Sequence, residues 1–164
     1  MPKAADVHIE AVAEALEHYA RRGVFRGFSR GTVQKGRAHF RMIWHRDRAF
    51  DFVLDLDKHT IRFPVVLPKV PANSAMYQEL KAFIKSRHSD ELPTHRRIDS
   101  RKAQVQASNR AGNVSLTLRV NHGDYAYGTR QLIHLVHEIF MTFLLDGRYY
   151  EYMVETFDLD PDKW

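Results

Sequence analysis

Hydrophobic residues near the start of the chain recur with the spacing of a helix. Ile9, Val12, Leu16 and Tyr19 fall on one side of this pattern, and the acidic residues between them fall on the other. An amphipathic helix of this kind buries its apolar stripe against the rest of the protein. Gly23 follows as a helix stop, so we expect the first helix to end just before it.

From residue 24 onward the hydrophobic period changes to two, which is typical of strands. The segments RAHFRMIW and AFDFVLDLD each place large apolar side chains at every second position. Core residues must oppose core residues in a hairpin. We therefore predict a three-residue loop, 46–48, that pairs Trp44 with Phe50 and Met42 with Phe52.

The same predicted register brings basic and acidic residues together on the outer face of this hairpin. His39 is expected to face Asp55, and Arg41 is expected to lie diagonal to Asp51 and Asp55. We therefore expect the outer face to be locally charge-balanced.

The middle of the chain predicts a further strand, a helix and a strand pair. The strand HTIRF is expected to end at Pro64, because proline has no N–H to donate to a sheet. Asn73 or Ser74 then caps a helix that carries NSAMYQELKAFIK. The segment QVQASNRAGNVSLTLRV predicts two strands around a turn at 109–113.

Two more helices are predicted after these strands. The segment NHGDYAYG reads as a loop, and a helix follows from about Thr129 with Leu132 and Val136 on its apolar stripe. Gly147 is placed to end that helix as a left-handed cap. The segment RYYEYMVETF predicts a last, short helix.

Together these elements predict an α+β fold in a single domain, residues 1–157. An antiparallel sheet is expected to carry an N-terminal, a middle and a long C-terminal helix, in the order α-β-β-β-(β)-α-β-β-α-α. Residues 158–164 are expected to form an acidic tail. The length of 164 residues suits one hydrophobic core rather than two.

The composition excludes several kinds of chemistry. The sequence has no cysteine, so it forms no disulfide, no thiolate nucleophile and no thiolate metal site. Its longest strongly apolar run, IFMTFLL, is far shorter than the roughly 20 residues that cross a membrane. We expect a cytoplasmic protein with no membrane span and no cofactor.

The stretch GFSRG fits the pattern Gly-x-Ser-x-Gly, which in one class of hydrolases holds a serine nucleophile on a turn from a strand into a helix. Here the residues that follow, GTVQKGRAHF, lead into another strand instead. We therefore expect no nucleophile at Ser29, and we expect Gly31 and Gly36 to shape a hairpin loop.

The helix segment HLVHE is a candidate metal site. His134 and Glu138 are four residues apart and share one helix face, and His137 lies on the flank of that face. Short zinc motifs place two histidines four residues apart, whereas these two are three apart. A solvated helix face explains the same residues. We therefore expect no metal and no enzymatic activity, and we keep a metal-dependent enzyme as the weaker alternative.

Positive charge is unevenly distributed along the chain, whose net charge is +5. Lys and Arg outnumber acidic residues at 21–48 and again at 85–102. The candidates for partner contacts are the arginines that we expect to lie free of acidic neighbours, namely Arg22, Arg26, Arg30, Arg96, Arg97 and Arg101. Such a basic surface predicts an acidic protein partner or, alternatively, a nucleic acid.

Tyrosines cluster after residue 124, and Tyr149 and Tyr152 are candidates for a partner-binding surface. Packing between the last two helices is the competing interpretation of the same residues.

The element order resembles the type III secretion chaperone-like fold over about residues 6–145. The resemblance rests on the N-terminal helix, the strands after it, the helix in NSAMYQELKAFIK, the strand NVSLTLRV and the long helix TRQLIHLVHEIFMTFLL. Secretion chaperones and bacterial domains described as sensory transduction regulators share this fold. The resemblance implies helices on one side of a twisted sheet, a homodimer, and a non-enzymatic role in binding protein segments.

Overall fold

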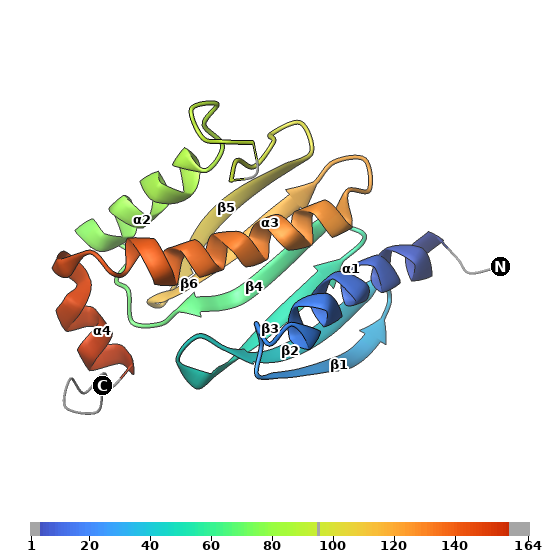
Figure 1. Cartoon of the computed structure of the whole chain (residues 1–164), viewed down its shortest axis with the longest axis horizontal. Coiled ribbons are helices and arrows are strands. Elements are labelled where there is room, and N and C mark those ends of the chain that lie inside the picture. The colour runs from blue at the N-terminus through green and yellow to red at the C-terminus, as the bar shows by residue number, and fades with distance from the viewer. Residues whose placement is uncertain (1–3, 95, 158–164) are drawn as a thin grey trace.

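The computed structural model describes residues 4–94 and 96–157 of the chain. Its centre is a six-stranded antiparallel sheet with the strand order β1-β2-β3-β4-β6-β5 (Figure 1). The strands are β1 (Gly27–Gln34), β2 (Arg37–Trp44), β3 (Arg48–Asp55), β4 (Thr60–Leu67), β5 (Ala103–Arg110) and β6 (Asn113–Val120).

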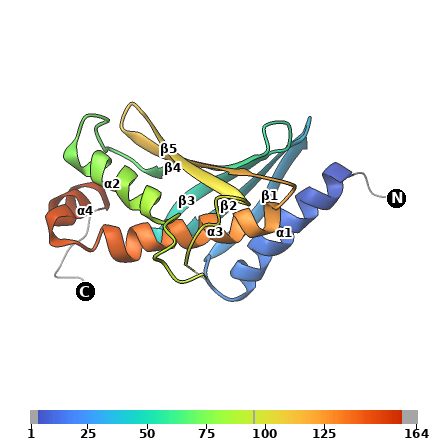
Figure 2. The same cartoon turned by 90° about the horizontal axis from the view of Figure 1, so that it is seen from above.

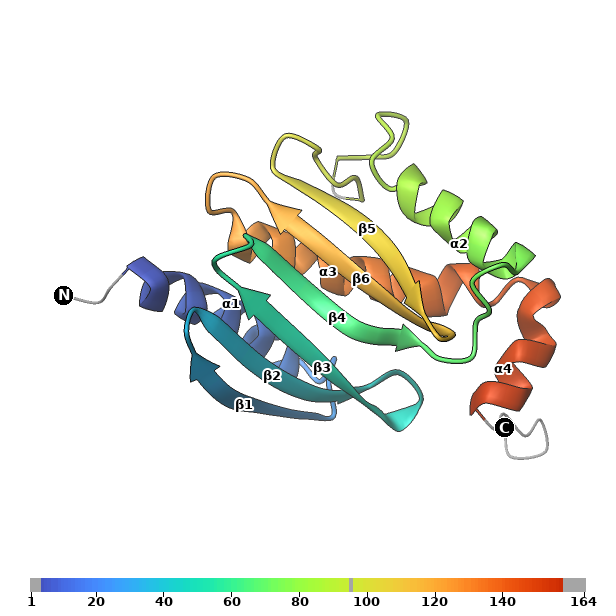
Figure 3. The same ribbon diagram turned by 180° about the vertical axis from the view of Figure 1, so that it is seen from behind.

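The described residues contain four α-helices, namely α1 (Ala4–Arg21), α2 (Ala75–Ser86), α3 (Tyr125–Glu138) and α4 (Tyr150–Phe157). Of these, α1 and α3 cover one face of the sheet (Figures 1 and 2). α1 and α3 pack against each other across the sheet, and α2 runs beside the edge strand β5. Figure 2 shows α1 and α3 on the same side, and Figure 3 shows the opposite face with no helix across it. The predicted α+β class and element order are confirmed, with four strands rather than three before α2.

The hydrophobic core lies between the sheet and its helices because the strands alternate between apolar and polar residues. Phe50, Phe52 and Leu54 of β3 are fully buried, and Val12 and Leu16 of α1 are buried with them. Burying side chains of this size stabilises the fold by about 1.5–3 kcal/mol each. One cluster of buried apolar residues includes side chains from all four helices.

The hairpin formed by β2 and β3 does not have the predicted register. Met42 pairs with Phe50 rather than with Phe52, and the connecting turn is η1 (His45–Asp47), one residue earlier than expected. The pairing differs by two positions, which leaves every core residue on the core face. The hydrophobic pattern alone therefore could not distinguish the two registers.

The observed register changes which charges meet on the outer face. Arg41 lies directly opposite Asp51, and Arg37 rather than His39 lies opposite Asp55. The distance from Arg41 Nε to Asp51 is 2.9 Å, and that from Arg37 Nε to Asp55 is 3.1 Å. The expected local charge balance is present, with partners that differ from the predicted ones.

The strand β4 does not end at Pro64 as predicted. It continues to Leu67, and the pairing with β6 shifts between Phe63 and Leu67. An irregularity of this kind accommodates a proline, because it interrupts the ladder where the N–H is missing.

The helix α3 begins at Tyr125 rather than near Thr129. The predicted loop contained Gly128, which instead lies inside the helix where it crosses the sheet. A Cβ atom at Gly128 would lie 2.7 Å from a methyl carbon of Val120 and 2.9 Å from one of Leu118. Glycine therefore allows the close packing of α3 on β6.

Gly147 does not end that helix as a left-handed cap. The chain continues from α3 through a π-helical turn, η2 (Ile139–Phe143). Gly147 then begins a short turn, η3 (Gly147–Tyr149), with a negative φ.

The GFSRG stretch lies within β1, where Ser29 pairs with Arg41 of β2. It is therefore not a turn from a strand into a helix. Gly36, with φ +76°, lies in the turn between β1 and β2 as expected, whereas Gly31 is part of the strand.

Candidate binding surfaces

The predicted arginines near the N-terminal helix have acidic partners. Arg30 lies 2.8 Å from Glu10 and 2.9 Å from Glu17, which ties β1 to α1. Their hydrogen bonds raise the pKa of the Arg30 guanidinium and lower that of the Glu10 carboxyl. Arg26 lies 3.2 Å from Asp47. The prediction that Arg26 and Arg30 lie free of acidic neighbours is wrong, because folding brings distant carboxylates to them.

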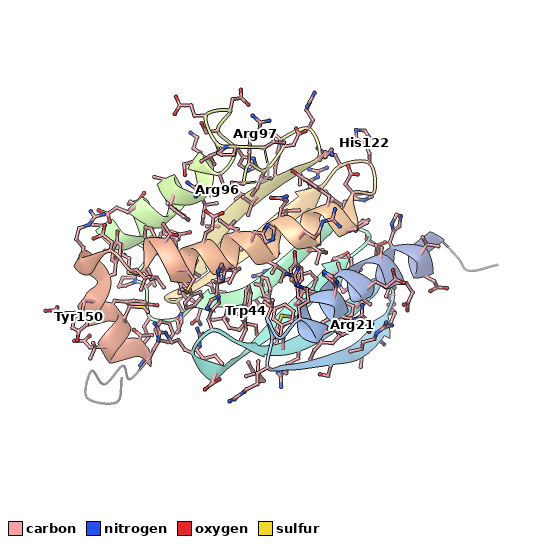
Figure 4. All side chains as sticks on the ribbon, viewed as in Figure 1. Arg21, Trp44, Arg96, Arg97, His122 and Tyr150 are labelled. Carbon is pink, nitrogen blue, oxygen red and sulfur yellow. The ribbon has the colours of Figure 1, made fainter. Side chains whose placement is uncertain are left out.

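The predicted arginines between α2 and β5 are compensated in the same way. Their carboxylate partners are Glu138 for Arg96 at 3.7 Å, Asp90 for Arg97 at 3.5 Å, and Asp99 for Arg101 at 3.1 Å. Figure 4 shows Arg96 and Arg97 on the opposite side of α3 from Arg21. Of the six predicted arginines, Arg22 alone lacks an ion pair within residues 4–94 and 96–157. The six do not form one basic patch, and their role in partner contacts stays a prediction.

The HLVHE side chains contact other residues rather than one another. The carboxylate of Glu138 is bound by Arg87 at the end of α2. Nε2 of His134 lies 3.4 Å from the hydroxyl of Tyr19, and His137 lies beside the turn between β2 and β3. In the part of the chain that the structure describes, no group of three or more His, Asp or Glu side chains is arranged to hold a metal ion.

His45 is packed among aromatic rings in the turn between β2 and β3. Its ring stacks on Phe140 with 4.4 Å between centroids, and its buried Nε2 has no hydrogen-bond partner among the described residues. Burial, with His137 and Arg46 nearby, lowers the pKa of His45 to about 4. The ring is therefore neutral at pH 7. The residues around the adjoining hollow of about 590 Å³ are Trp44, His45, Arg46, Asp47, Phe140, Met141 and Leu145.

Tyr149 and Tyr152 pack against the rest of the protein. Tyr149 is 5% exposed and stacks on Phe143 with 4.7 Å between ring centroids. Tyr152 donates its hydroxyl hydrogen bond to the carbonyl of Pro68 at 2.7 Å, and burial raises the pKa of its phenol. Packing of the last helices accounts for both side chains, whereas the neighbouring Tyr150 is half exposed (Figure 4).

A groove lies between α2 and the edge strand β5, which run beside each other in Figures 1 and 3. Ser74, one of the two predicted caps, is the N-cap of α2 and accepts a hydrogen bond from the N–H of Tyr77 at 3.1 Å. The groove encloses about 420 Å³. Its walls are formed by Tyr77, Lys81, Ile84, Lys85 and His88 on one side and by Val105, Gln106 and Ala107 on the other.

The strand β5 directs backbone groups into this groove. Residues of an edge strand bond alternately to the neighbouring strand and away from it. The N–H of Val105 points away from β6, because it donates to Nε2 of His88 at 3.4 Å, and the N–H of Ala103 does the same to Asp99 at 3.0 Å. Ala107 is the next residue in this series. Its outward N–H and C=O have no hydrogen-bond partner among the described residues.

Two lysines on α2 make the rim of the groove positive. Lys81 and Lys85 are exposed and one helical turn apart, and neither forms an ion pair within the described ranges. Nζ of Lys81 lies 4.9 Å from the ring centroid of Tyr77, a buried residue of the same wall. The acidic residue of α2, Glu79, does not neutralise these lysines, because it is bound to Arg148 at 2.9 Å.

Reasoning from the sequence did not identify this groove. The helical spacing of Lys81 and Lys85 was visible, as was the strand that contains Val105 and Ala107. The pairing of β6 with β4, which leaves β5 at the edge, depends on contacts between distant segments. The local pattern carries no signal for such contacts.

None of the helices in the described residues has the length and apolar character that a membrane crossing requires. Comparison with known proteins finds no matching protein-family model, curated protein or solved structure. The resemblance to the type III secretion chaperone-like fold therefore stays a prediction.

Proposed function

We propose that this chain is a non-enzymatic binding module, chaperone-like or regulatory, that binds an extended acidic segment of a protein partner between α2 and β5. The observation that carries the proposal is the unpaired backbone of Ala107 at the edge of β5, in a groove. A partner segment that lies along this edge can bond to the N–H and C=O of Ala107 as an additional strand, while the N–H of Val105 stays with His88. Its side chains reach the apolar residues of the walls, such as Ile84 and Val105, and its carboxylates meet Lys81 and Lys85.

The distribution of aromatic residues favours a protein partner over a nucleic acid. Single-stranded nucleic acids bind to exposed rings on which bases stack, together with unpaired cations. The aromatic residues of the strands all pack on the core side of the sheet, namely Phe28, Phe40, Trp44, Phe50, Phe52 and Phe63. Most of the predicted arginines are also occupied by carboxylates. Nucleic-acid binding is therefore the alternative outcome of the test.

Fluorescence anisotropy with a labelled peptide of Glu and Val residues tests the proposal. We expect binding that weakens with salt, and no binding of the matching peptide of Lys and Val. Ala107→Pro removes only an outward N–H, which an edge strand tolerates. It should weaken binding at least about fivefold, the effect of one lost hydrogen bond of about 1 kcal/mol.

A double substitution on α2 tests the charged rim separately. Lys81→Gln with Lys85→Gln should weaken binding of the acidic peptide by about three- to tenfold, since exposed charge pairs contribute up to about 1 kcal/mol each. Arg22→Gln, in the turn after α1, is the control, because it removes an exposed positive charge outside the groove. Equal binding by wild type and all these variants would contradict the proposal. Tighter binding of a single-stranded oligonucleotide would favour the nucleic-acid alternative.

The homodimer implied by the family resemblance belongs to the same proposal. Native mass spectrometry of the purified chain tests it directly, because the spectrum reports the number of subunits. A spectrum with monomer alone at micromolar concentration contradicts the dimer and leaves the groove to be tested by the peptide.

A further inference from the structure

The sheet face opposite the helices is polar and has basic residues near its centre. In Figure 3 the six strands cross this face without a covering helix. Outward positions on β4 and β6 carry Thr60, Arg62, Thr117 and Arg119, since their neighbours Ile61 and Leu118 are fully buried on the other side. This surface is separate from the groove between α2 and β5, so the inference does not depend on the proposed function.

Two arginines lie diagonally across β4 and β6 without an acid between them. Arg62 pairs with Thr117, and Thr60 pairs with Arg119. Both arginines are exposed, and neither forms an ion pair among the residues that the structure describes. Like charges on neighbouring strands repel each other, and a bound anion relieves that repulsion.

A hollow on the same face brings a lysine and hydroxyl groups to Arg62. It encloses about 340 Å³. Its walls are Arg37, Val53, Asp55, Lys58, Thr60, Arg62, Pro64 and Thr117. Threonine hydroxyls can donate to anion oxygens, while Arg and Lys supply charged donors from the side.

The carboxylate of Asp55, which is 7% exposed, does not cancel the charge of Arg62 and Lys58. One of its oxygens accepts from Arg37 at 3.1 Å. The other accepts from the backbone N–H groups of Asp57 at 3.1 Å and Lys58 at 3.2 Å. Both oxygens are thus engaged, one by Arg37 of β2 and the other by the turn between β3 and β4, and the positive charges of Lys58 and Arg62 are left for a ligand.

We infer that this hollow binds a phosphomonoester or free phosphate dianion. Lys58 and Arg62 match its two negative charges, and Arg119 adds a third positive charge at the edge. The hydroxyls of Thr60 and Thr117 serve further oxygens, of which a phosphate offers more than a carboxylate does. A phosphorylated side chain of a protein and free phosphate share this chemistry.

Isothermal titration calorimetry with inorganic phosphate and with a phosphoserine peptide tests the inference. We expect at least one of the two probes to bind to the wild type. Arg62→Gln should weaken that binding at least tenfold, and Thr117→Val, which keeps the shape of the side chain, should weaken it about threefold. Arg41→Gln is the matched control on the same face, because Arg41 is paired with Asp51 outside the hollow. This substitution should leave the binding of both probes unchanged.

The two probes distinguish the source of the phosphate. Binding of inorganic phosphate alone assigns the hollow to a free anion, and tighter binding of the phosphoserine peptide than of its unphosphorylated form assigns it to a modified protein. The inference is overturned if neither probe binds or if Arg62→Gln and Arg41→Gln behave alike. It is also overturned if a single-stranded oligonucleotide competes at lower concentration than either probe.

Discussion

At the scale of single residues, Gly128 sets the distance between α3 and the sheet. Gly128→Ala places a Cβ atom 2.7 Å from Val120 and 2.9 Å from Leu118, closer than any ordinary contact. The helix must move away or the core must repack. We expect the free energy of unfolding to fall by about 1–3 kcal/mol, as for other overpacked cores.

Urea unfolding followed by circular dichroism measures this loss. Gly147→Ala is the matched control, because a Cβ there meets no atom within 4 Å and its φ is negative. That control should change the stability by less than about 0.5 kcal/mol. Equal stability of the two variants would show that α3 does not depend on close approach at Gly128.

The neutral ring of His45 makes stability depend on pH. Its pKa is about 4 in the folded protein, whereas a histidine in an unfolded chain has a pKa of about 6.5. Between these values the unfolded state binds more protons. The free energy of unfolding therefore falls as the pH is lowered from about 6.5 to about 4, by at most about 1.4 kcal/mol per pH unit.

Urea unfolding of wild type and His45→Phe across this range isolates the contribution of His45. Phenylalanine keeps a ring against Phe140 and cannot be protonated, so the variant should lose less stability than the wild type as the pH falls. His39→Gln, at an exposed position on the sheet, should follow the wild type. If wild type and His45→Phe show the same dependence of stability on pH, His45 is not the group responsible for it.

At the scale of elements, Glu138 connects the ends of α2 and α3. Its side chain is 18% exposed, and that of its partner Arg87 is 11% exposed. Glu138→Gln leaves the charge of Arg87 poorly solvated and unpaired. We expect a loss of about 1–3 kcal/mol in urea unfolding, less than for a fully buried pair.

The exposed pair on the outer sheet face provides the comparison. Arg41 and Asp51 are both more than half exposed, so Asp51→Asn should cost less than about 1 kcal/mol. If Glu138→Gln lowers the free energy of unfolding no more than Asp51→Asn does, apolar packing rather than the ion pair between Arg87 and Glu138 holds α2 against α3.

The elements themselves could be predicted because each has its own periodicity. Leu16 in α1 and Phe52 in β3 belong to patterns that place them in the core whatever the tertiary structure. The register of β2 on β3 could not be predicted, because a shift of two positions leaves the hydrophobic pattern unchanged. The predicted start of α3 was too late because the sequence places Gly128 before it. A glycine in a loop and a glycine in a tightly packed helix cannot be distinguished from the sequence alone.

The candidate sites were less predictable than the elements, because they depend on contacts between distant segments. Arg30 looked unpaired until folding brought Glu10 and Glu17 to it. The sequence did not indicate a site at Arg62 and Arg119, because they are single charges on separate strands. Folding places them diagonally across β4 and β6. The distribution of charge along the chain therefore predicted too much free positive charge at 21–48 and 85–102. It did not predict the basic surface that contains Arg62 and Arg119.

At the scale of the whole molecule, two halves of the sheet share one core. β1 to β4 follow one another in sequence and in space, whereas β5 and β6 join them only through the pair β4–β6. α3 packs on both β4 and β6, and the buried residues form one cluster. A single core of this size should unfold in one cooperative transition.

Two probes of one urea titration test this cooperativity. In a Trp164→Phe background, the fluorescence of Trp44 reports on the region around Phe25 and Phe50, where its ring contacts theirs at 5.2 and 5.6 Å between centroids. Far-ultraviolet circular dichroism reports on all helices and strands together. The two midpoints should coincide, because neither half of the sheet keeps a complete core without α3. An earlier transition in circular dichroism than in fluorescence would instead mean that the β5–β6 side separates first, and the groove beside α2 would then open independently of the rest.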